Sequence, residues 1–186
     1  GSTSSVAAEM LGKSGSGTVI AAELQTNGRG QGDHRWFSAK GENLTFSILL
    51  EYDADHCLNA SEQQLLSMAT SLAVVDFLKG EGIDASIKLP NDVYVGNNKI
   101  CGMLIENGIR GRLLDWSIIG IGININQTEF PEELANPVSM RTLTGKAYEK
   151  TKCLSEFLRH FVTRFDAIWT EPEALNKEYL NKLISI

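Results

Sequence analysis

One short segment concentrates residue types that bind anions. Residues 25–36 read QTNGRGQGDHRW, where Gly28, Gly30 and Gly32 surround Arg29 and other polar side chains. Glycine lets a backbone come close to a ligand, and the donor fork of arginine matches the oxygens of carboxylates and phosphates. The segment predicts a loop that binds an anion, although a mobile surface loop has the same composition. It lacks the Gly-Lys-Ser/Thr of a P-loop and the apolar helix that follows a dinucleotide-binding fingerprint.

Two further segments carry polar side chains that could contact a ligand. In KLPNDVYV, residues 88–95, Pro90 favours an extended Leu89, so Lys88 lies at the end of a strand just before a polar corner. A lysine in this position is either an amphipathic surface side chain or a cation of a site. The chain also begins with GSTSS, whose uncharged hydroxyls suit the cap of a helix.

Two strands hold the ends of the glycine-rich loop. Residues 18–25 read as a strand, and residues 43–50 alternate apolar with polar side chains, as half-buried strands do. The connection of about sixteen residues is longer than a hairpin needs, and loops of that length are usually functional or disordered. A capping box of Ser61 and Gln64 begins the most apolar helix. Helices are expected at 4–11, 61–79, 152–169 and 172–183.

The second half of the chain predicts a hairpin and a long alternating strand. Strands are expected at 85–95, 99–106 and 113–126, with turns at 96–98 and 107–112. In the last strand, isoleucines at alternate positions form a core face. The opposite face carries Gly120, Gly122, Asn124 and Asn126, and it is flat enough for the close approach of a ligand or a backbone. This order predicts an α+β fold, a mixed, mostly antiparallel sheet with helices packed on one face.

Composition narrows the class of protein. The 186 residues are 42% hydrophobic and 22% charged, as expected of one globular domain, and the net charge of −6 opposes general nucleic-acid binding. No apolar run approaches the roughly 20 residues of a membrane span, and the first residues lack the pattern of a secretory signal. The three cysteines form no C-x-x-C pair, which favours a reducing, cytoplasmic compartment and argues against a zinc site.

The order of the motifs resembles the catalytic domain of the biotin protein ligases. The matching segments are Ser2-Thr3-Ser4, QTNGRGQGDHRWFS, KLPND, KICGMLIE and GIGININ. Each motif is short, but together they follow the family's order over nearly the whole chain. The resemblance implies a class II aminoacyl-tRNA-synthetase-like fold. It also implies one catalytic domain at 1–186, without the N-terminal helix-turn-helix domain and the C-terminal small β-barrel that usually accompany it.

The resemblance implies an ATP-dependent ligase that acts in two steps. The carboxylate of biotin attacks the α-phosphorus of ATP, pyrophosphate leaves, and biotinyl-5′-AMP stays bound. The ε-amine of a lysine on a biotin carboxyl carrier domain then attacks the mixed anhydride and releases AMP. Cationic donors that close over both anions and exclude water suit this reaction. Mg²⁺ would arrive with ATP rather than on a protein metal cluster, no nucleic acid or membrane is expected, and a homodimer is left open.

The family's motifs assign roles to individual residues. Biotin binding is assigned to Ser2, Thr3, Ser4, Gln25, Arg29, Gly30, Gln31 and Lys88. Lys88 and Arg29 would be catalytic, because they stabilise negative charge. ATP contacts are assigned to Trp36, Phe37, Asn91, Lys99 and Asn124. Three positions depart from the usual pattern: Ser4 replaces an asparagine, Gln31 an arginine and Leu89 a tryptophan.

Two alternatives share the fold or the ligand. Lipoate ligases and octanoyl transferases have the same architecture, but the transferases that use a cysteine need an exposed thiol. Cys101, which lies near the motif, is part of the apolar run KICGMLIE and is expected to be buried. The second alternative is a catalytically weak module that binds biotin or its adenylate, which the changes at Ser4 and Gln31 favour.

Overall fold

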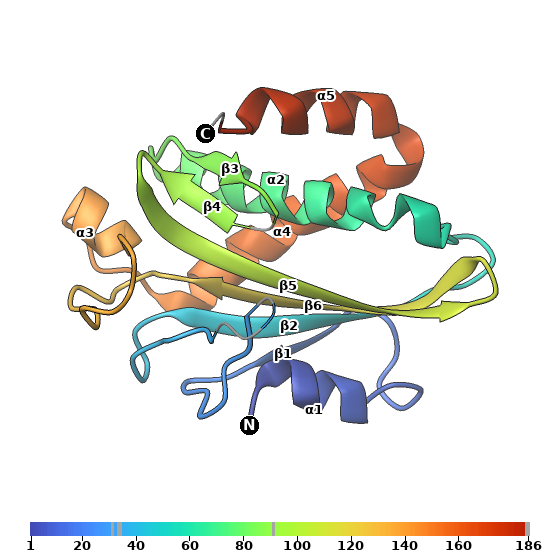
Figure 1. Cartoon of the computed structure of the whole chain (residues 1–186), viewed down its shortest axis with the longest axis horizontal. Helices are drawn as coiled ribbons and strands as arrows, with labels where there is room; N and C mark the ends of the chain where they lie inside the picture. Colours follow the sequence, from blue (N-terminus) through green and yellow to red (C-terminus); the bar gives the residue numbers. More distant parts are fainter. Residues whose placement is uncertain (31, 33–34, 91, 185–186) are drawn as a thin grey trace. The chain divides into compact units, whose positions relative to one another are not determined.

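The computed structural model describes residues 1–30, 32, 35–90 and 92–184 (Figure 1). In chain order its elements are α1 (Thr3–Glu9), β1 (Thr18–Ala21), β2 (Leu44–Glu51), the 3₁₀ helix η1 (Ala60–Glu62), α2 (Gln64–Gly80), β3 (Ser86–Lys88), β4 (Asp92–Val95), β5 (Asn98–Arg110), β6 (Leu113–Ile123), α3 (Met140–Thr144), α4 (Lys150–Thr170) and α5 (Pro172–Lys182). The strands pair in the order β1-β2-β6-β5-β4-β3. The pairs β1/β2, β3/β4 and β4/β5 are antiparallel, so the expected α+β class is confirmed.

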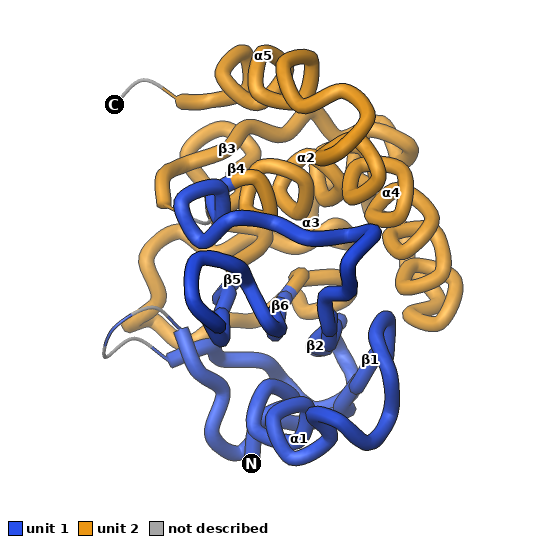
Figure 2. Tube along the Cα trace, turned by 90° about the vertical axis from the view of Figure 1, so that its right-hand side faces the viewer, with its two compact units in different colours: residues 1–64, 103–122 blue, residues 65–102, 123–186 orange. Residues whose placement is uncertain are grey.

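The chain folds into two compact units, which Figure 2 colours separately. Unit 1 comprises residues 1–64 and 103–122, and unit 2 comprises residues 65–102 and 123–186. Each unit therefore combines segments that are distant in the sequence. No helix within the described part of the chain combines the length and the apolar character that a membrane span requires.

In unit 1, helix α1 packs on β2 and β6. Ala7, Leu49 and Ile118 form a fully buried cluster, with 0%, 0% and 1% of their surface exposed. Ser2 caps the helix, because its side chain accepts a hydrogen bond from the backbone N–H of Ser5. The apolar contact and the cap together fix the first turn of α1, which carries the hydroxyl motif.

Strand β5 is longer than predicted, and the expected turn at 107–112 is wrong. The strand continues to Arg110, and the connection to β6 is made at Gly111, whose φ is 65°. Asn107 does not turn the chain because its side chain is engaged within unit 1. Its Nδ2 donates to Gln63 Oε1 at 3.0 Å, and its Oδ1 accepts from Ser117 Oγ at 2.5 Å. These contacts with distant residues override the turn preference of an Asn-Gly pair.

In unit 2, three helices are linked through Arg164 of α4. Arg164 Nε donates to Asp76 Oδ2 on α2 at 2.7 Å, and Arg164 Nη2 lies 2.8 Å from Glu178 Oε2 on α5. The predicted helices at 152–169 and 172–183 are confirmed to within two residues at each end. The core isoleucine face is confirmed as well, since Ile119, Ile121, Ile123 and Ile125 are all at most 3% exposed.

Three predicted boundaries need correction. The segment 85–95 is two strands, because Pro90 has no N–H to continue a ladder and Ser86 pairs back with Tyr94. The predicted capping box of Ser61 and Gln64 is wrong. Asn59 forms it instead, with its backbone N–H and its Nδ2 donating to Glu62 Oε2 at 3.2 and 2.8 Å.

Two elements differ in extent from the prediction. Strand β1 ends at Ala21 rather than at residue 25, and the chain after it leads to the polar contacts of Gln25 described below. The short helix α3 was not predicted. It begins after Ser139, whose side chain accepts from the N–H of Thr142, and it ends at Gly145 with φ at 74°.

Candidate active site

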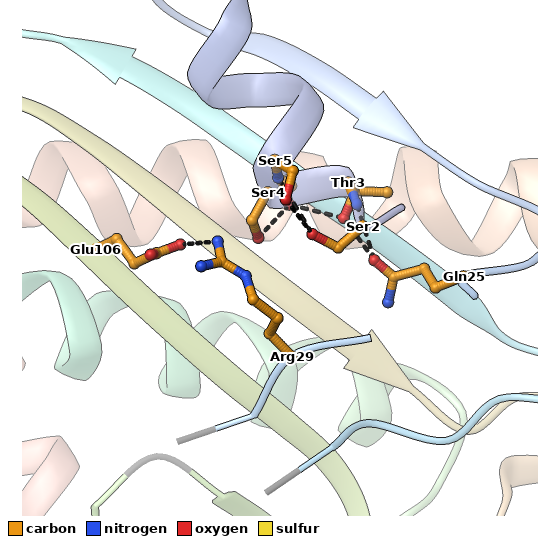
Figure 3. Close-up of polar contacts among 8 residues, drawn as sticks. Ser2, Thr3, Ser4, Ser5, Gln25, Arg29 and Glu106 are labelled. Atoms are coloured by element: carbon orange, nitrogen blue, oxygen red, sulfur yellow. Dashed lines mark hydrogen bonds and ion pairs between the residues drawn. The ribbon is translucent and has the colours of Figure 1, made fainter. Parts of the chain in front are cut away.

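Buried hydroxyl groups meet at the start of α1 in unit 1 (Figure 3). Thr3 Oγ1 lies 2.8 Å from Ser47 Oγ of β2, and Ser4 Oγ lies 3.1 Å from the same atom. Ser47 is fully buried, and Thr3 and Ser4 are 4% and 6% exposed. Hydroxyls both donate and accept, so this cluster can bind a neutral ligand group that has N–H and C=O atoms.

The role of Ser47 was missed by reasoning from the sequence. The residue was read as part of the polar face of a half-buried strand, but β2 is buried on both faces over residues 44–50. A serine between Phe46 and Ile48 in such a strand needs a polar partner, because buried polar groups are almost always hydrogen-bonded. That requirement was the available signal.

Gln25 joins the glycine-rich loop to the hydroxyl cluster. Its Oε1 accepts from the backbone N–H of Thr3 at 2.8 Å and from Thr3 Oγ1 at 3.3 Å. The oxygen is therefore engaged, and the amide nitrogen is the atom that can donate to a ligand carbonyl. The structure thus brings together two of the motifs that were quoted separately.

The base of the loop is narrow. The N–H of Trp36 donates to the carbonyl of Gly28 at 3.2 Å, and Arg29 and Arg35 form an antiparallel bridge. A Cβ atom at Gly28 would overlap the carbonyl oxygen of Trp36. Glycine is required at this position because two backbone segments come together there.

Arg29 forms an ion pair with Glu106 of β5. Arg29 Nη2 lies 2.5 Å from Glu106 Oε2, and the two side chains are 40% and 35% exposed. In Figure 3 the guanidinium of Arg29 points toward Glu106. Arg29 is thus held by a carboxylate that the motifs did not assign to any role.

The flat face of β6 accepts other groups at short range, as predicted. A Cβ atom at Gly122 would overlap the indole of Trp36, and one at Gly120 would lie 2.8 Å from Ser4 Oγ. The two glycines allow the indole and the first turn of α1 to lie directly on the strand. Phe37, the other aromatic residue assigned to ATP, is 45% exposed.

The two candidate lysines belong to unit 2. Lys88 Nζ lies 5.0 Å from the centre of the Tyr94 ring, within the range of a cation–π contact. Lys99 Nζ lies 2.9 Å from Asp92 Oδ1, and these side chains are 31% and 27% exposed. Both lysines keep part of their surface in solvent, so an anion can replace water at either ammonium group.

Asn124 is buried in unit 2 and has one acceptor to spare. Its Nδ2 donates to the carbonyl of Val138 at 3.1 Å, and its N–H donates to the carbonyl of Ile100 at 2.9 Å. Its Oδ1 is buried and has no hydrogen-bond partner among the described residues. This oxygen can accept from a ligand N–H or O–H or contact a cation, but it cannot bind a phosphate oxygen directly.

The structure therefore distributes the predicted residues between the two units. Unit 1 brings together Ser2, Thr3, Ser4, Gln25, Arg29 and Gly30 with Trp36 and Phe37. Lys88, Lys99 and Asn124 belong to unit 2. Gln31 and Asn91 lie outside the described residues. In the described part of the chain, no three His, Cys, Asp or Glu side chains are grouped so that they could hold a metal ion.

A family model matches two thirds of the sequence. The model of the biotin/lipoate A/B protein ligase family covers residues 2–124, which include the hydroxyl cluster, the glycine-rich loop and both lysines. The chain belongs to this family.

Relatives in this family extend beyond the matched region. The bifunctional ligase/repressor BirA of Bacillus subtilis is 31% identical over 153 residues, which are 80% of this chain and 46% of the relative. Biotin–protein ligase 1, chloroplastic, of Arabidopsis thaliana is 32% identical over 158 residues, 81% of this chain and 41% of the relative. The chain thus spans less than half the length of these two proteins.

Solved structures of family members share the fold. The biotin protein ligase of Aquifex aeolicus in complex with biotin and ATP has a TM-score of 0.80 and 28% identity, and the match covers 98% of this chain and 75% of the other. The Leishmania major biotin protein ligase in complex with biotinyl-5-AMP has a TM-score of 0.78 and 25% identity, with 98% and 78% covered. The fold is that of the biotin protein ligase catalytic domain.

Within the biotin/lipoate A/B protein ligase family, a cysteine nucleophile is disfavoured here. Cys101 is fully buried, as expected, and burial together with the charge of Asp92 raises the pKa of its thiol. A buried thiol with a raised pKa supplies little thiolate. Of the other two cysteines, Cys153 is buried and Cys57 is exposed. Cys57 lies outside the five motifs.

Proposed function

We propose that the chain activates biotin with ATP and transfers it to a lysine of a biotin carboxyl carrier domain. One observation carries the proposal: unit 1 combines a neutral cluster of hydroxyl and amide groups with a guanidinium. Biotin has the matching chemistry, a neutral ureido group at one end and a carboxylate at the other. The relatives solved with biotin and ATP or with biotinyl-5-AMP support the same assignment.

The hydroxyl cluster is proposed to bind the ureido group. Thr3, Ser4 and Ser47 can accept from the ureido N–H groups, and the amide nitrogen of Gln25 can donate to the ureido oxygen. Ser4 lacks the amide of the usual asparagine. It compensates in part, because its hydroxyl is held by Ser47 at 3.1 Å instead of turning freely.

The loop is proposed to bind the anionic end of the ligand. Arg29 offers charge-assisted hydrogen bonds to the carboxylate and later to the phosphate of the adenylate. Gly30 and Gln31 complete this set, with Gln31 as a neutral donor. Neutralising two anions that must approach each other lowers the barrier to their reaction, and excluding water protects the mixed anhydride.

In the first step, a carboxylate oxygen of biotin bonds to the α-phosphorus of ATP and the bond to pyrophosphate breaks. Lys88 is proposed to donate to the carboxylate and the α-phosphate as negative charge builds up. Lys99 is proposed to bind the nucleotide. Neither lysine forms a covalent bond to the substrate. Mg²⁺ enters with ATP and is part of that substrate.

The remaining nucleotide contacts are assigned by chemistry. Trp36 and Phe37 offer aromatic surface to the adenine ring. Asn91 offers an amide. Asn124 offers a buried carbonyl oxygen, which is suited to an amino or hydroxyl donor of the nucleotide or to its cation.

In the second step, the lysine amine of the carrier attacks the carbonyl carbon of the anhydride. The bond to the phosphate oxygen breaks, AMP leaves, and the amine loses its proton to give an amide. A relative from Mycobacterium tuberculosis is named biotin–[acetyl-CoA-carboxylase] ligase, which supports a carrier of this kind. The free cysteines fit a reducing compartment, so we place the reaction in the cytoplasm.

The experiment that tests this proposal is ATP–pyrophosphate exchange with and without biotin. Exchange that depends on biotin is expected, with little stimulation by lipoate or octanoate. Exchange driven by lipoate or octanoate would assign the chain to the other branch of the family. Biotin binding without exchange would reduce the function to that of a binding module.

A further inference from the structure

The ion pair in unit 1 gives Glu106 a role that none of the motifs assigns. We propose that Glu106 is a positioning residue, which holds the guanidinium of Arg29 ready for the carboxylate of the ligand. The inference rests on the proposed binding of biotin by this chain. Glu106 itself does not contact biotin in this account and acts through Arg29.

The geometry leaves most of the guanidinium available. Glu106 Oε2 contacts one nitrogen of Arg29, Nη2, at 2.5 Å. A guanidinium has five N–H donors, and no other described side chain forms a hydrogen bond or an ion pair with that of Arg29. A carboxylate that occupied two nitrogens would block the fork, whereas this contact leaves donors for a second anion.

The two partners differ in how firmly their backbones are held. Glu106 lies inside β5, next to Asn107, whose side chain is bonded to both Gln63 and Ser117. Arg29 lies between Gly28 and Gly30 in the loop. A fixed strand residue therefore orients a long side chain from a flexible sequence, which reduces the rotamer freedom that Arg29 would otherwise lose on binding a ligand.

A competing account gives the opposite sign. If Glu106 only occupied Arg29 until a ligand displaced it, removing its charge would strengthen the binding of biotin. The single contact favours positioning over competition, because a ligand carboxylate can bind the remaining donors without breaking the pair. Both side chains are partly exposed, so solvent weakens the repulsion between the two carboxylates.

Calorimetry on Glu106→Ala and Glu106→Gln tests the inference. With Glu106→Ala, the dissociation constant of biotin should rise about five- to tenfold, or about 1.0 to 1.4 kcal/mol. The affinity for biotinol, which has an alcohol in place of the carboxylate, should not change. Glu106→Gln should bind biotin nearly as well as the wild type, because its amide oxygen still accepts from Arg29. In an Arg29→Ala background, Glu106→Ala should have no further effect.

Trypsin gives a readout that needs no ligand. Release of Arg29 by Glu106→Ala should speed cleavage after Arg29, whereas cleavage after Arg35 in the same loop should keep its rate. A general loosening of the loop would speed both cuts and overturn the inference. Unchanged or tighter biotin binding by Glu106→Ala would overturn it too. If the wild type bound no biotin, the proposed function would fail together with it.

Discussion

The polar groups of unit 1 and the lysines of unit 2 are held in different ways. In unit 1, Thr3, Ser4, Ser47 and Gln25 are tied to one another by hydrogen bonds of 2.8 to 3.3 Å and are largely buried. In unit 2, Lys88 contacts an aromatic ring and Lys99 a carboxylate, and both remain partly exposed. Neutral groups can be fixed in the interior because they satisfy each other. Ammonium groups stay near solvent because burying an unpaired charge is costly.

This difference predicts that the lysines matter for chemistry more than for folding. Lys88→Ala should lower biotin-dependent ATP–pyrophosphate exchange by about 100-fold or more, since preorganised charge on a developing anion is worth at least that. The thermal unfolding midpoint should stay close to that of the wild type, because only one cation–π contact is lost. Both are measured on the same purified variant.

Lys99→Ala is the matched control in unit 2. It should raise the KM for ATP more than it lowers kcat, because Lys99 is assigned to nucleotide binding. The reverse pattern, in which Lys88→Ala retains exchange and Lys99→Ala abolishes it, would transfer the activating role to Lys99.

The buried cluster should matter for stability. Ser47→Ala leaves two buried hydroxyls, Thr3 and Ser4, without their common partner, and should lower the free energy of unfolding by about 2 kcal/mol. Denaturant titration measures it. Ser71→Ala is the control, because this buried serine bonds only to carbonyls of its own helix, so little change is expected. Equal losses in both variants would show that the cluster has no special role.

Unit 1 also contains a pH-sensitive group at Tyr52. Burial raises its pKa to about 12, and a hydrogen bond with Ser117 partly offsets the rise. An unfolded tyrosine ionises near pH 10, so between pH 10 and pH 12 the folded state holds a proton that the unfolded state has lost. Stability therefore falls as the pH rises through this window, by about 2 kcal/mol.

Comparison with Tyr52→Phe tests this assignment. The variant cannot ionise at this position, so its free energy of unfolding should fall less between pH 10 and pH 12 than that of the wild type. Tyr179→Phe in unit 2 is the matched variant, since burial raises the pKa of Tyr179 as well. Parallel curves for the wild type and Tyr52→Phe would contradict the burial argument.

The sequence predicted the features that depend on local pattern. The alternation in β6 identified both the isoleucine core and the glycine face, and Gly122 does lie under Trp36. Partners distant in the chain were not predictable. Ser47 and Glu106 pair with residues 44 and 77 positions away, and no periodicity reports such pairs. The turn predicted at 107–112 failed for the same reason, because Asn107 is bonded to Gln63 and Ser117.

Calorimetry with biotin on the wild type and on Arg29→Ala tests the central claim most directly. The claim is that the loop of unit 1 supplies the cation for the carboxylate of biotin. Arg35→Ala is the control, since it removes the same charge from the same loop. Arg29→Ala should raise the dissociation constant at least about tenfold, or about 1.4 kcal/mol, while Arg35→Ala has little effect. An unchanged constant in Arg29→Ala would contradict the account.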